Sequence, residues 1–312
     1  MATYLVTGGA GFIGSNIVAE LLHRNETIRV LDNFSTGRQI NLAAVLADIE
    51  LVEGDLRDLD TCRRAVAGVD YVLHQAAIPS VPRSIDDPLT TNDVAVKGTL
   101  NMLIASRDAG VKRFIYASSS SVYGDSPQLP KQETMALRPK SPYAVAKLSG
   151  EYYTRIFAEV YGLETVSLRY FNVFGPRQDP ASPYSAVIPL FIKSMLAGRS
   201  PMIYGDGRQS RDFTFVSNNV EANLLATTAP NVSGQVFNIA CGHRFSLLDL
   251  VNALNDIMGA AVEPTFDTAR SADVKHSLAD IRLAQDQLGY QVKVDFKGGL
   301  AKTVAWYQEH HD

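Results

Sequence analysis

The alternation of apolar and polar residues predicts a series of strands and helices over the first half of the chain. Short apolar runs have the length of buried strands, and segments with amphipathic helical spacing stand between them. The expected strands are residues 4–6, 28–32, 49–55, 69–77, 114–118 and 164–169, and the expected helices are residues 12–22, 91–109 and 141–161. Strands that alternate with helices in this way form a mostly parallel sheet that is covered on both faces. We therefore expect an α/β fold built on a doubly wound parallel sheet.

Beyond residue 175 the pattern is less regular. Turn-forming residues are frequent in 176–183, and residues 203–212 have the composition of a loop. We expect strands at 213–216 and 236–240, and a helix with a serine cap at 246–258. An apolar segment at 262–266, a polar stretch to residue 280 and a terminal helix complete a smaller lobe, in which we expect the substrate to be recognised.

The first strand ends in a glycine-rich turn, Gly8-x-x-Gly11-x-x-Gly14. A strand, this turn, a helix and a second strand follow within about thirty residues, which is the context of a dinucleotide-binding fingerprint. Gly8 is suited to a tight turn, Gly11 to close approach of a pyrophosphate, and Gly14 to close packing of the helix on the strand. Free N–H groups at the start of the helix then face the phosphates. A plain strand–turn–helix junction is the alternative interpretation.

Asp32 ends the second strand and favours NAD over NADP. A carboxylate at this position accepts hydrogen bonds from the ribose hydroxyls and repels a 2′-phosphate, although the nearby Arg38 keeps NADP as a lesser alternative. The polar loop 33–37 is suited to wrap around the adenosine half of the cofactor. After the third strand, Asp55 and Leu56 are placed to contact the adenine, and the alternative for Asp55 is the N-cap of the next helix.

Two further strand ends carry small or hydroxyl-bearing residues. Ala76 and Ala77 close the fourth strand, where small side chains let a flat ring or a ribose lie on the backbone. The fifth strand delivers the serines at 118–121 to the same edge of the sheet. His74, within the fourth strand, is expected to be a packed residue rather than a catalytic one.

Tyr143 and Lys147 lie one helical turn apart and share a face. A free tyrosine, with a pKa of about 10, is a poor base at neutral pH. A nearby ammonium and the positive charge of an oxidised nicotinamide favour the phenolate, which can take a hydroxyl proton while a hydride leaves the same carbon. A hydroxyl of the serine cluster can bridge the phenol and the reacting oxygen. The alternative is a pair of exposed helix residues, against which the nucleotide fingerprint and the serine-rich strand end argue.

Composition limits the classes of partner. The chain has 312 residues, of which 46% are hydrophobic and 20% charged, and its formal charge is −4 without a basic block. These values argue against nucleic acid and anionic membranes as partners. Cys62 and Cys241 form neither a metal-ligand spacing nor a disulfide framework, so we expect no metal and a cytoplasmic location. We also expect no signal peptide and no membrane span.

Together these motifs resemble the extended short-chain dehydrogenase/reductase family, and within it the nucleotide-sugar 4-epimerases, over essentially the whole chain. In the family's order stand Thr7-Gly-Gly-Ala-Gly-Phe-Ile-Gly14, Asp32-Asn33, Asp55-Leu56, Gln75-Ala-Ala77, Ser118-Ser-Ser-Ser-Val-Tyr-Gly124, Tyr143-x-x-x-Lys147 and Arg169-Tyr-Phe-Asn172. The resemblance implies a Rossmann-type sheet, NAD as cofactor and a UDP-sugar as substrate. Residues 1–175, plus strands near 213–240, would form the NAD-binding domain. Residues 176–312, mainly 176–212 and 261–312, would form a smaller α/β lobe that binds the UDP-sugar.

The resemblance also implies roles for single residues. Ser119, five residues before Gly124, stands at the position of the catalytic hydroxyl, Tyr143 at that of the base, and Lys147 at that of the residue that lowers its pKa and holds the nicotinamide ribose. The implied cofactor-binding residues are Gly8, Gly11, Phe12, Ile13, Gly14, Asp32, Asn33, Ser35, Thr36, Gly37, Asp55, Leu56, Gln75, Ala76, Ala77, Asn92, Tyr143, Lys147 and Tyr170. The implied substrate-binding residues are Ser80, Arg83, Ser119, Ser120, Tyr143, Asn172, Gln178, Ala186, Val187, Tyr204, Arg211, Arg270, Asp273 and Ser277. An arginine fork suits a diphosphate, and the alternative for Arg211 and Arg270 is a solvated loop charge.

Two departures refine the implied reaction. Ser120 and Ser121 replace the Asp-Glu pair of dehydratase relatives, so dehydration is not expected. Ser277 stands where a tyrosine marks relatives restricted to plain hexoses, and a serine leaves room for an N-acetyl group, although a larger pocket does not exclude a smaller sugar. The motifs Ser80-Val-Pro-Arg-Ser84 and Arg177-Gln-Asp179 also resemble bacterial epimerases that prefer UDP-N-acetylglucosamine or its uronic acid.

We therefore expect an NAD-dependent enzyme that interconverts UDP-N-acetylglucosamine and UDP-N-acetylgalactosamine through a transient 4-keto sugar. The alternatives within the enzyme class are a UDP-glucose 4-epimerase, a UDP-glucuronate 4-epimerase and a UDP-glucuronate decarboxylase. A catalytically silent NAD-binding regulatory protein is the alternative from a different class.

A symmetric homodimer is a further expectation. The helices at 91–109 and 143–160 carry apolar residues on their outer faces, including Leu100, Leu103, Tyr153 and Phe157. In family members such helices pair with their twins in a four-helix bundle. The alternative is that these side chains serve only the core of the monomer.

Overall fold

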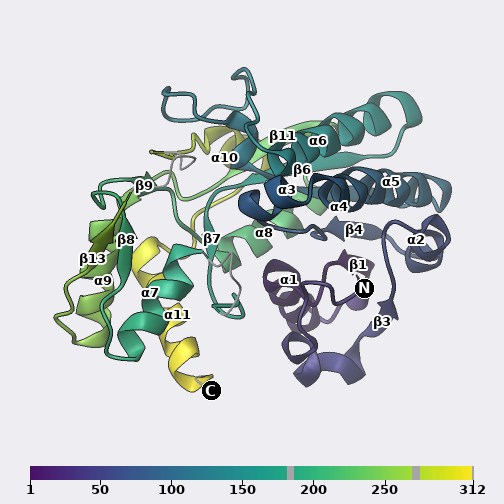
Figure 1. The fold of residues 1–312 in the computed structure, drawn as a ribbon. Coiled ribbons are helices and arrows are strands. Elements are labelled where there is room, and N and C mark those ends of the chain that lie inside the picture. The colour runs from purple at the N-terminus through teal and green to yellow at the C-terminus, as the bar shows by residue number, and fades with distance from the viewer. Residues whose placement is uncertain (181–185, 269–274, 311–312) are drawn as a thin grey trace.

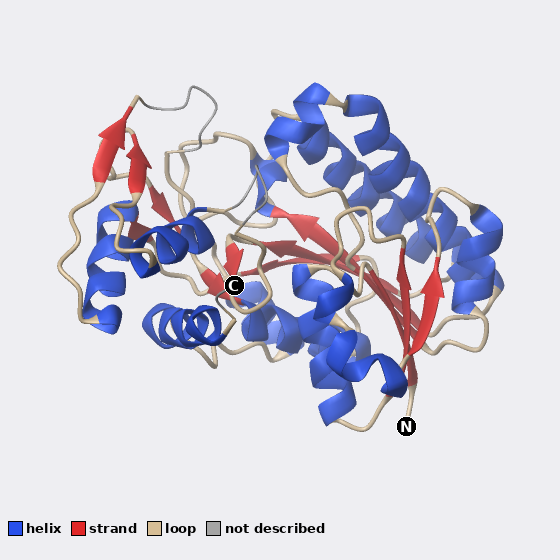
Figure 2. Ribbon diagram, turned by 60° about the horizontal axis from the view of Figure 1, so that its bottom comes forward, coloured by secondary structure: helices blue, strands red, loops and turns tan. Residues whose placement is uncertain are grey.

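A parallel seven-stranded sheet forms the centre of the molecule. The computed structural model describes residues 1–180, 186–268 and 275–310. The sheet has the order β11-β6-β5-β4-β1-β2-β3, with every neighbouring pair parallel. Its strands are β1 Thr3–Thr7, β2 Thr27–Asp32, β3 Glu50–Glu53, β4 Tyr71–His74, β5 Arg113–Ser119, β6 Thr165–Tyr170 and β11 Gln235–Ile239. Helices cover both faces (Figure 2). The expected doubly wound α/β fold is confirmed.

The two faces of the sheet bury separate layers of apolar side chains. In β1, Tyr4 and Val6 belong to one buried cluster and Leu5 to another, because successive strand residues point to opposite faces. The helices on the first face are α1 Phe12–His23 and α8 Val216–Thr228, and those on the second are α2 Leu59–Val66, α5 Gly98–Asp108 and α6 Pro142–Tyr161. The helix α4, Pro88–Asn92, lies beside α6 and runs through a π-helical turn, Asp93–Lys97, into α5 (Figure 1).

Local signals explain where the helices that carry function begin and end. The Ser141 hydroxyl accepts a hydrogen bond from the Ala144 N–H at 3.2 Å, and Pro142 takes the first helical position of α6, which suits a residue without an N–H. Gly162, with φ of 71°, ends α6 in the left-handed conformation.

In the second half, three helices and a small sheet form the group of elements at the left of Figure 1. The helices α7 Val187–Leu196, α9 Leu247–Met258 and α11 Phe296–Glu309 pack on one another, and β8 Met202–Tyr204 pairs with β13 Thr265–Asp267. The expected serine cap of α9 is present, because Ser246 forms a capping box with Asp249. The remaining short elements are α3 Val81–Asp86, α10 Arg282–Leu288, β7 Val173–Phe174, β9 Ser210–Arg211, β10 Thr214–Phe215, β12 Phe245–Ser246 and the 3₁₀ helices Gln39–Asn41, Ala43–Asp48 and Ser120–Tyr123.

Several expectations for the second half were wrong. The segment expected to be a loop at 203–212 contains β9 and most of β8, and the strand expected at 213–216 is the two-residue β10, which leads directly into α8. The sequence pattern did not indicate α7 or α8. The buried face of α8 carries Asn218, Asn219 and Asn223, so its apolar periodicity is interrupted. The buried side chain of Asn218 finds its hydrogen-bond partner in a distant part of the chain, because its amide donates to the Val294 carbonyl at 2.7 Å.

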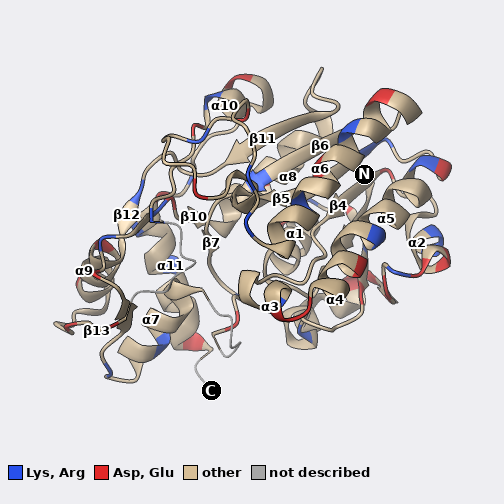
Figure 3. Cartoon of the chain, turned by 45° about the horizontal axis from the view of Figure 1, so that its top comes forward, with Lys and Arg blue, Asp and Glu red and all other residues tan. Residues whose placement is uncertain are grey.

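The two-stranded pairing of β10 with β7 lies outside the large sheet, whereas β11 forms its edge. The division of the chain into two domains stays a prediction. Acidic and basic residues are interspersed along surface helices such as α2 and α10 (Figure 3). Among the described helices, none combines the length and the apolar character that a membrane crossing requires.

Candidate active site

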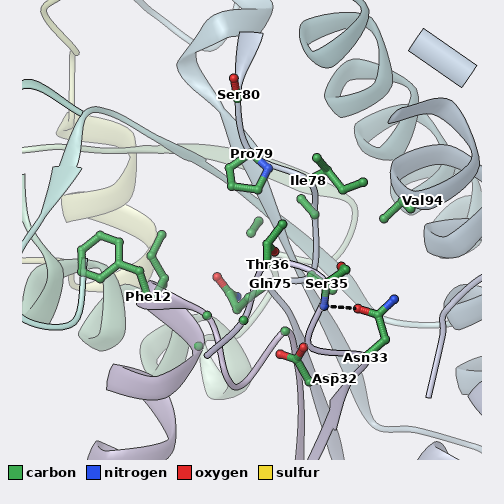
Figure 4. Close-up of a pocket in the computed structure, with 18 of the residues that line it drawn as sticks. Phe12, Asp32, Asn33, Ser35, Thr36, Gln75, Ile78, Pro79, Ser80 and Val94 are labelled. Atoms are coloured by element: carbon green, nitrogen blue, oxygen red, sulfur yellow. Dashed lines mark hydrogen bonds between the residues drawn. The ribbon is translucent and has the colours of Figure 1, made fainter. Parts of the chain in front are cut away.

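A cavity of about 740 Å³ opens at the carboxyl ends of the strands, where the order of the sheet reverses between β1 and β4. This is the place where ligands bind in open α/β sheets. Figure 4 shows side chains from several strand ends converging on it. The expected cofactor residues that line it are Gly8, Gly11, Phe12, Ile13, Gly14, Asp32, Asn33, Ser35, Thr36, Gly37, Asp55, Leu56, Gln75, Ala76, Ala77, Tyr143, Lys147 and Tyr170. We call it the cofactor cavity.

Asn92 is the one expected cofactor residue that does not line this cavity. It is exposed at the end of α4. The π-helical turn that follows changes the direction of the side chains, and Val94 from that turn faces the cavity instead (Figure 4).

The glycine-rich turn is packed so closely that side chains are excluded from it. Gly8 has φ of 68°, and a Cβ atom there would lie 2.8 Å from the Ala76 Cα atom. A Cβ atom on Gly14 would lie 2.2 Å from the Gly8 carbonyl oxygen. No side chain caps the N-terminus of α1. The turn therefore presents backbone N–H groups to the cavity, which is an arrangement that fits a pyrophosphate.

Asp32 is held rigidly at the end of β2. Its two oxygens accept hydrogen bonds from the Ala10 N–H at 2.9 Å and the Phe34 N–H at 2.8 Å, and burial raises the pKa of its carboxyl group. A Cβ atom on Gly37 would lie 2.9 Å from both carboxylate oxygens. In the same loop the Ser35 N–H donates to the Asn33 side chain at 3.1 Å (Figure 4). The loop is thereby wrapped around the carboxylate.

The alternative reading of Asp55 as a helix cap was wrong. Asp58 caps α2 by accepting from the N–H groups of Asp60 and Thr61. The carboxylate of Asp55 is instead paired with Arg57 at 2.7 Å, which holds its pKa at about 2, and it accepts from the Asn33 amide at 2.9 Å. It therefore stays ionised next to the adenosine loop at neutral pH.

His74 is a packed strand residue, as expected. Its ring nitrogens lie 2.8 Å from the Thr7 hydroxyl and 3.0 Å from the Thr99 hydroxyl. Burial lowers the pKa of His74 to about 3, so the ring is neutral at physiological pH.

Tyr143 and Lys147 lie in the first turns of α6, and Ser119 at the end of β5 lies near them. Ser119 lies close enough to the Tyr143 hydroxyl to lower its pKa. The Lys147 ammonium donates to the Ala117 carbonyl at 2.7 Å and lies 5.9 Å from the centre of the Tyr143 ring. The three side chains that the sequence selected are thus neighbours in space.

The electrostatic balance differs from the expectation in one respect. Burial raises the pKa of Tyr143, and the nearby Ser119 side chain opposes this shift, whereas Lys147 contributes no comparable effect. Burial also lowers the pKa of Lys147 to about 8, with Glu151 opposing. The desolvation of both groups outweighs their attraction, so the protein alone does not favour the phenolate.

A second cavity of about 380 Å³ adjoins the first and shares Ile13, Ser118, Tyr143 and Tyr170 with it. We call it the substrate cavity. The expected substrate residues that line it are Ser119, Ser120, Tyr143, Asn172, Arg211 and Ser277. Lys131 and His276, which the sequence did not single out, also line it. Tyr143 therefore stands between the two spaces, as a proton acceptor between a sugar and a nicotinamide must.

The other expected substrate residues lie elsewhere. Those that line the cofactor cavity are Ser80, Arg83, Gln178 and Ala186. For Gln178, this placement follows from the bonds that hold residues 176 and 177 to α1. Val187 and Tyr204 belong to α7 and β8 and line neither cavity. Arg270 and Asp273 lie outside the described residues.

The comparison with known proteins decides the family. Residues 4–240 match the NAD dependent epimerase/dehydratase family. The chain belongs to this family. The UDP-glucose 4-epimerase of Mycolicibacterium smegmatis is 40% identical over 308 residues, which cover 97% of this chain and 98% of that enzyme. The expected membership of the extended short-chain dehydrogenase/reductases is confirmed.

Solved structures of this epimerase/dehydratase family agree over the whole chain. The UDP-N-acetylglucosamine 4-epimerase of Methanobrevibacter ruminantium, in complex with UDP-N-acetylmuramic acid, has a TM-score of 0.94 and 40% identity, with 99% of each chain covered. A variant of the UDP-glucuronic acid 4-epimerase of Bacillus cereus, with UDP-4-deoxy-4-fluoro-glucuronic acid and NAD, has a TM-score of 0.92 and 30% identity and covers 99% of this chain and 100% of that one. NAD is confirmed as the cofactor.

Sequence reasoning missed a hydrogen-bonded ring below the site. The Tyr170 hydroxyl donates to Gln75 at 3.0 Å and accepts from the Asn223 amide at 2.6 Å, and Gln75 donates to Asn223 at 2.9 Å. This ring holds two cavity residues against α8: Gln75, which directly follows β4, and Tyr170, the last residue of β6. No sequence signal pointed to Asn223, because nothing in the pattern showed that α8 exists.

Sequence reasoning also missed a buried ion pair between α6 and β6. Glu151 accepts from the Arg169 guanidinium at 2.9 and 2.7 Å and from the Ser118 hydroxyl. Arg169 also donates to the Tyr123 hydroxyl at 2.8 Å. Glu151 lies one helical turn beyond Lys147, so its position on the same face of α6 was a signal that could have been read.

Proposed function

We propose that the protein is an NAD-dependent UDP-sugar 4-epimerase, and that its substrates are UDP-N-acetylglucosamine and UDP-N-acetylgalactosamine. The observation that carries the proposal is the position of Tyr143. Its side chain lines both cavities, and it shares the second cavity with Ser119. A base at this junction meets the carbon-4 hydroxyl of a sugar in one cavity and the nicotinamide end of a dinucleotide in the other.

Tyr143 takes the proton of the carbon-4 hydroxyl, and Ser119 positions that hydroxyl through its own hydrogen bond. A bound NAD would supply the acceptor for the carbon-4 hydride and the source for its return to the opposite face of the sugar. Lys147 holds a positive charge between the Ala117 carbonyl and the cavity, where it binds the nicotinamide ribose. The charge of the oxidised cofactor adds to that of Lys147, and together they offset the burial that raises the pKa of Tyr143.

Return of the hydride to the other face requires that the 4-keto sugar turns within the substrate cavity. Arg211 and Asn172, which line this cavity, would hold the diphosphate while the sugar moves. Binding energy from the remote nucleotide then keeps the intermediate in place without fixing its sugar ring.

Two rival functions, a dehydratase and a silent regulatory protein, agree less well with the site. A dehydratase needs an acid to protonate the oxygen that leaves carbon 6, and the described lining of the cavity contains no Asp or Glu. Ser120 and Ser121 stand at the relevant positions, and a hydroxyl is too weak an acid for this step. A silent regulatory protein would not require Tyr143, Lys147 and Ser119 to meet.

Ser277 supports the N-acetylhexosamine preference. It lines the substrate cavity with a small side chain, which leaves space for a carbon-2 N-acetyl group. A UDP-glucuronate 4-epimerase is the second candidate, because Lys131 lines the same cavity and an ammonium there suits a carboxylate. Separate incubations with UDP-N-acetylglucosamine, UDP-glucose and UDP-glucuronate, followed by separation of the products, test the proposal. Net accumulation of NADH or release of carbon dioxide would contradict it.

We expect Ser277→Tyr to lower kcat/KM for UDP-N-acetylglucosamine about tenfold more than kcat/KM for UDP-glucose, because the larger side chain fills the space of the N-acetyl group. The measurement is the initial rate with each sugar. Ser200→Tyr, at an exposed loop position away from both cavities, is the matched control and should change neither rate. An equal loss for the two sugars would show that Ser277 does not act as the gate.

We also propose that the enzyme is a homodimer, but through other residues than those first selected. Leu103 and Phe157 are buried in the monomer's own core, and Leu100 and Tyr153 pack against it. Apart from Tyr161 at its end, the exposed large apolar residues of α6 are instead Val145, Tyr152, Ile156 and Val160, each 43–65% exposed. Their spacing places them along one stripe of the helix, which a twin helix would cover.

We expect Ile156→Glu to convert the dimer into a monomer at micromolar concentration, because it would bury an unpaired charge in the interface. Sedimentation velocity measures the change. Ile40→Glu replaces an exposed apolar residue outside α6 and should leave the dimer intact. A wild-type protein that sediments as a monomer would end the dimer proposal.

A further inference from the structure

Residues 176–179 fold back over the start of α1 and line the cofactor cavity. The Arg177 guanidinium donates to the Ser15 carbonyl at 2.6 Å, and the Asn16 amide donates to the Pro176 carbonyl at 3.1 Å. Arg177, Gln178 and Asp179 all line the cavity. Their backbone follows β7, far from the glycine-rich turn in sequence, so this segment forms a wall that the nucleotide fingerprint does not supply.

The segment is fastened to two other parts of the chain. Asp179 forms an ion pair with Arg38 of the adenosine loop at 3.6 Å, and the Tyr307 hydroxyl of α11 donates to the Gln178 carbonyl. Arg177 has φ of 69°, a left-handed conformation that is unfavourable for a residue with a side chain. A backbone held in such a conformation marks a side chain whose direction matters.

The charge of Arg177 has no counterion in the described part of the chain. No carboxylate in those residues forms an ion pair with it, and burial lowers its pKa without an opposing acidic neighbour. Its bond to the Ser15 carbonyl leaves further N–H donors of the guanidinium for a ligand. Ser15 follows Gly14 directly, so the guanidinium lies at the first turn of α1, where the backbone N–H groups already favour an anion. A partly buried cation is stable when an anion completes its surroundings.

We propose that Arg177 is a cofactor-binding residue whose guanidinium, held beside the first turn of α1, contacts the pyrophosphate of NAD next to the glycine-rich turn. The inference rests on the NAD chemistry of the proposed function. An epimerase returns the same hydride to its substrate, so the cofactor must remain bound through many cycles. Arg177 and the ion pair of Asp179 with Arg38 would then slow the loss of the dinucleotide.

The test compares Arg177→Gln, Arg177→Gly and wild type for NAD retained after gel filtration, quantified by chromatography of the denatured protein. Loss of one charge-assisted contact predicts about a tenfold to hundredfold faster dissociation of NAD in both variants. Arg177→Gly is informative because glycine adopts the left-handed backbone without cost, so it removes the side chain while relieving the strain. The exposed Arg208→Gln is the matched control and should retain NAD like wild type. NAD retained at the wild-type level in Arg177→Gly would overturn the proposal.

A second measurement separates a pyrophosphate contact from a merely structural role. ADP-ribose contains the diphosphate and adenosine does not. The proposal requires that Arg177→Gln weakens ADP-ribose about tenfold or more and leaves adenosine unchanged, whereas equal weakening of both ligands would contradict it. Neither measurement depends on turnover. A wild-type protein that holds no NAD would refute the proposed function. If wild type is active and the Arg177 variants hold as much NAD as it does, only the assignment of Arg177 is refuted.

Discussion

Tyr143→Phe is expected to lower kcat for UDP-sugar epimerisation about a thousandfold while NAD remains bound. The variant removes the hydroxyl that receives the carbon-4 proton, and a positioned acid or base commonly contributes two to four orders of magnitude. The ring and its packing on α6 are preserved, so the cofactor cavity keeps its shape. Turnover of UDP-N-acetylglucosamine and the content of bound NAD, measured on one preparation, check both parts of the expectation.

The same helix offers the control. Tyr152 is 57% exposed and lines neither cavity, so Tyr152→Phe should retain wild-type turnover. In wild type the rate should rise with pH below the pKa of Tyr143, because the ionised phenol is the base and burial raises that pKa. Tyr143→Phe should abolish this dependence. Turnover near the wild-type rate in Tyr143→Phe would show that another group is the base.

Glu151→Ala is expected to lower the free energy of unfolding by about 3–5 kcal/mol, because it leaves the charge of Arg169 buried without a partner. Both side chains of this pair are at most 4% exposed. Urea denaturation followed by circular dichroism measures the change. The exposed pair of Arg155 and Glu159 on the same helix provides the control, since Glu159→Ala should cost about 0.5 kcal/mol or less.

A double replacement distinguishes two causes of instability: the loss of the attraction between the two charges, and the burial of one charge without a partner. Glu151→Met combined with Arg169→Met removes both charges, and buried ion pairs replaced by apolar side chains often lose little stability. We expect the double variant to be more stable than Glu151→Ala. A cost below about 1 kcal/mol for Glu151→Ala would mean that water reaches Arg169 and that the pair is not sealed in the core.

The parts of the fold that sequence reasoning predicted are those with local signals. The glycine-rich turn and Asp32 specify β1, α1 and β2, and the cap at Ser141 with Gly162 at the other end specifies α6. Parallel strands present their carboxyl ends at one edge, so residues at strand ends could be assigned to one site without knowing how the helices pack. This is why Ser119, from β5, and Tyr143, from α6, were brought together correctly.

The parts that could not be predicted depend on contacts between distant segments. Gln75 and Asn223 are bonded although 148 residues separate them, and the buried asparagines of α8 concealed that helix. The pKa of Tyr143 was misjudged for a similar reason, because the spacing of Tyr143 and Lys147 reveals their proximity but not how deeply each is buried. Burial is set by the whole fold and outweighs the pair's attraction here.

The pairing of β5 with β6 sets a strict limit on changes of chain length. Ser118 lies opposite Arg169, and Ser119 lies opposite Tyr170. The side chains of the first pair both bond to Glu151, whereas those of the second pair do not, and Ser119 and Tyr170 line the substrate cavity. Because neighbouring strand residues face opposite ways, the insertion or deletion of one residue in either strand would exchange the structural pair for the functional one. We expect such changes to be lethal to the enzyme within these two strands.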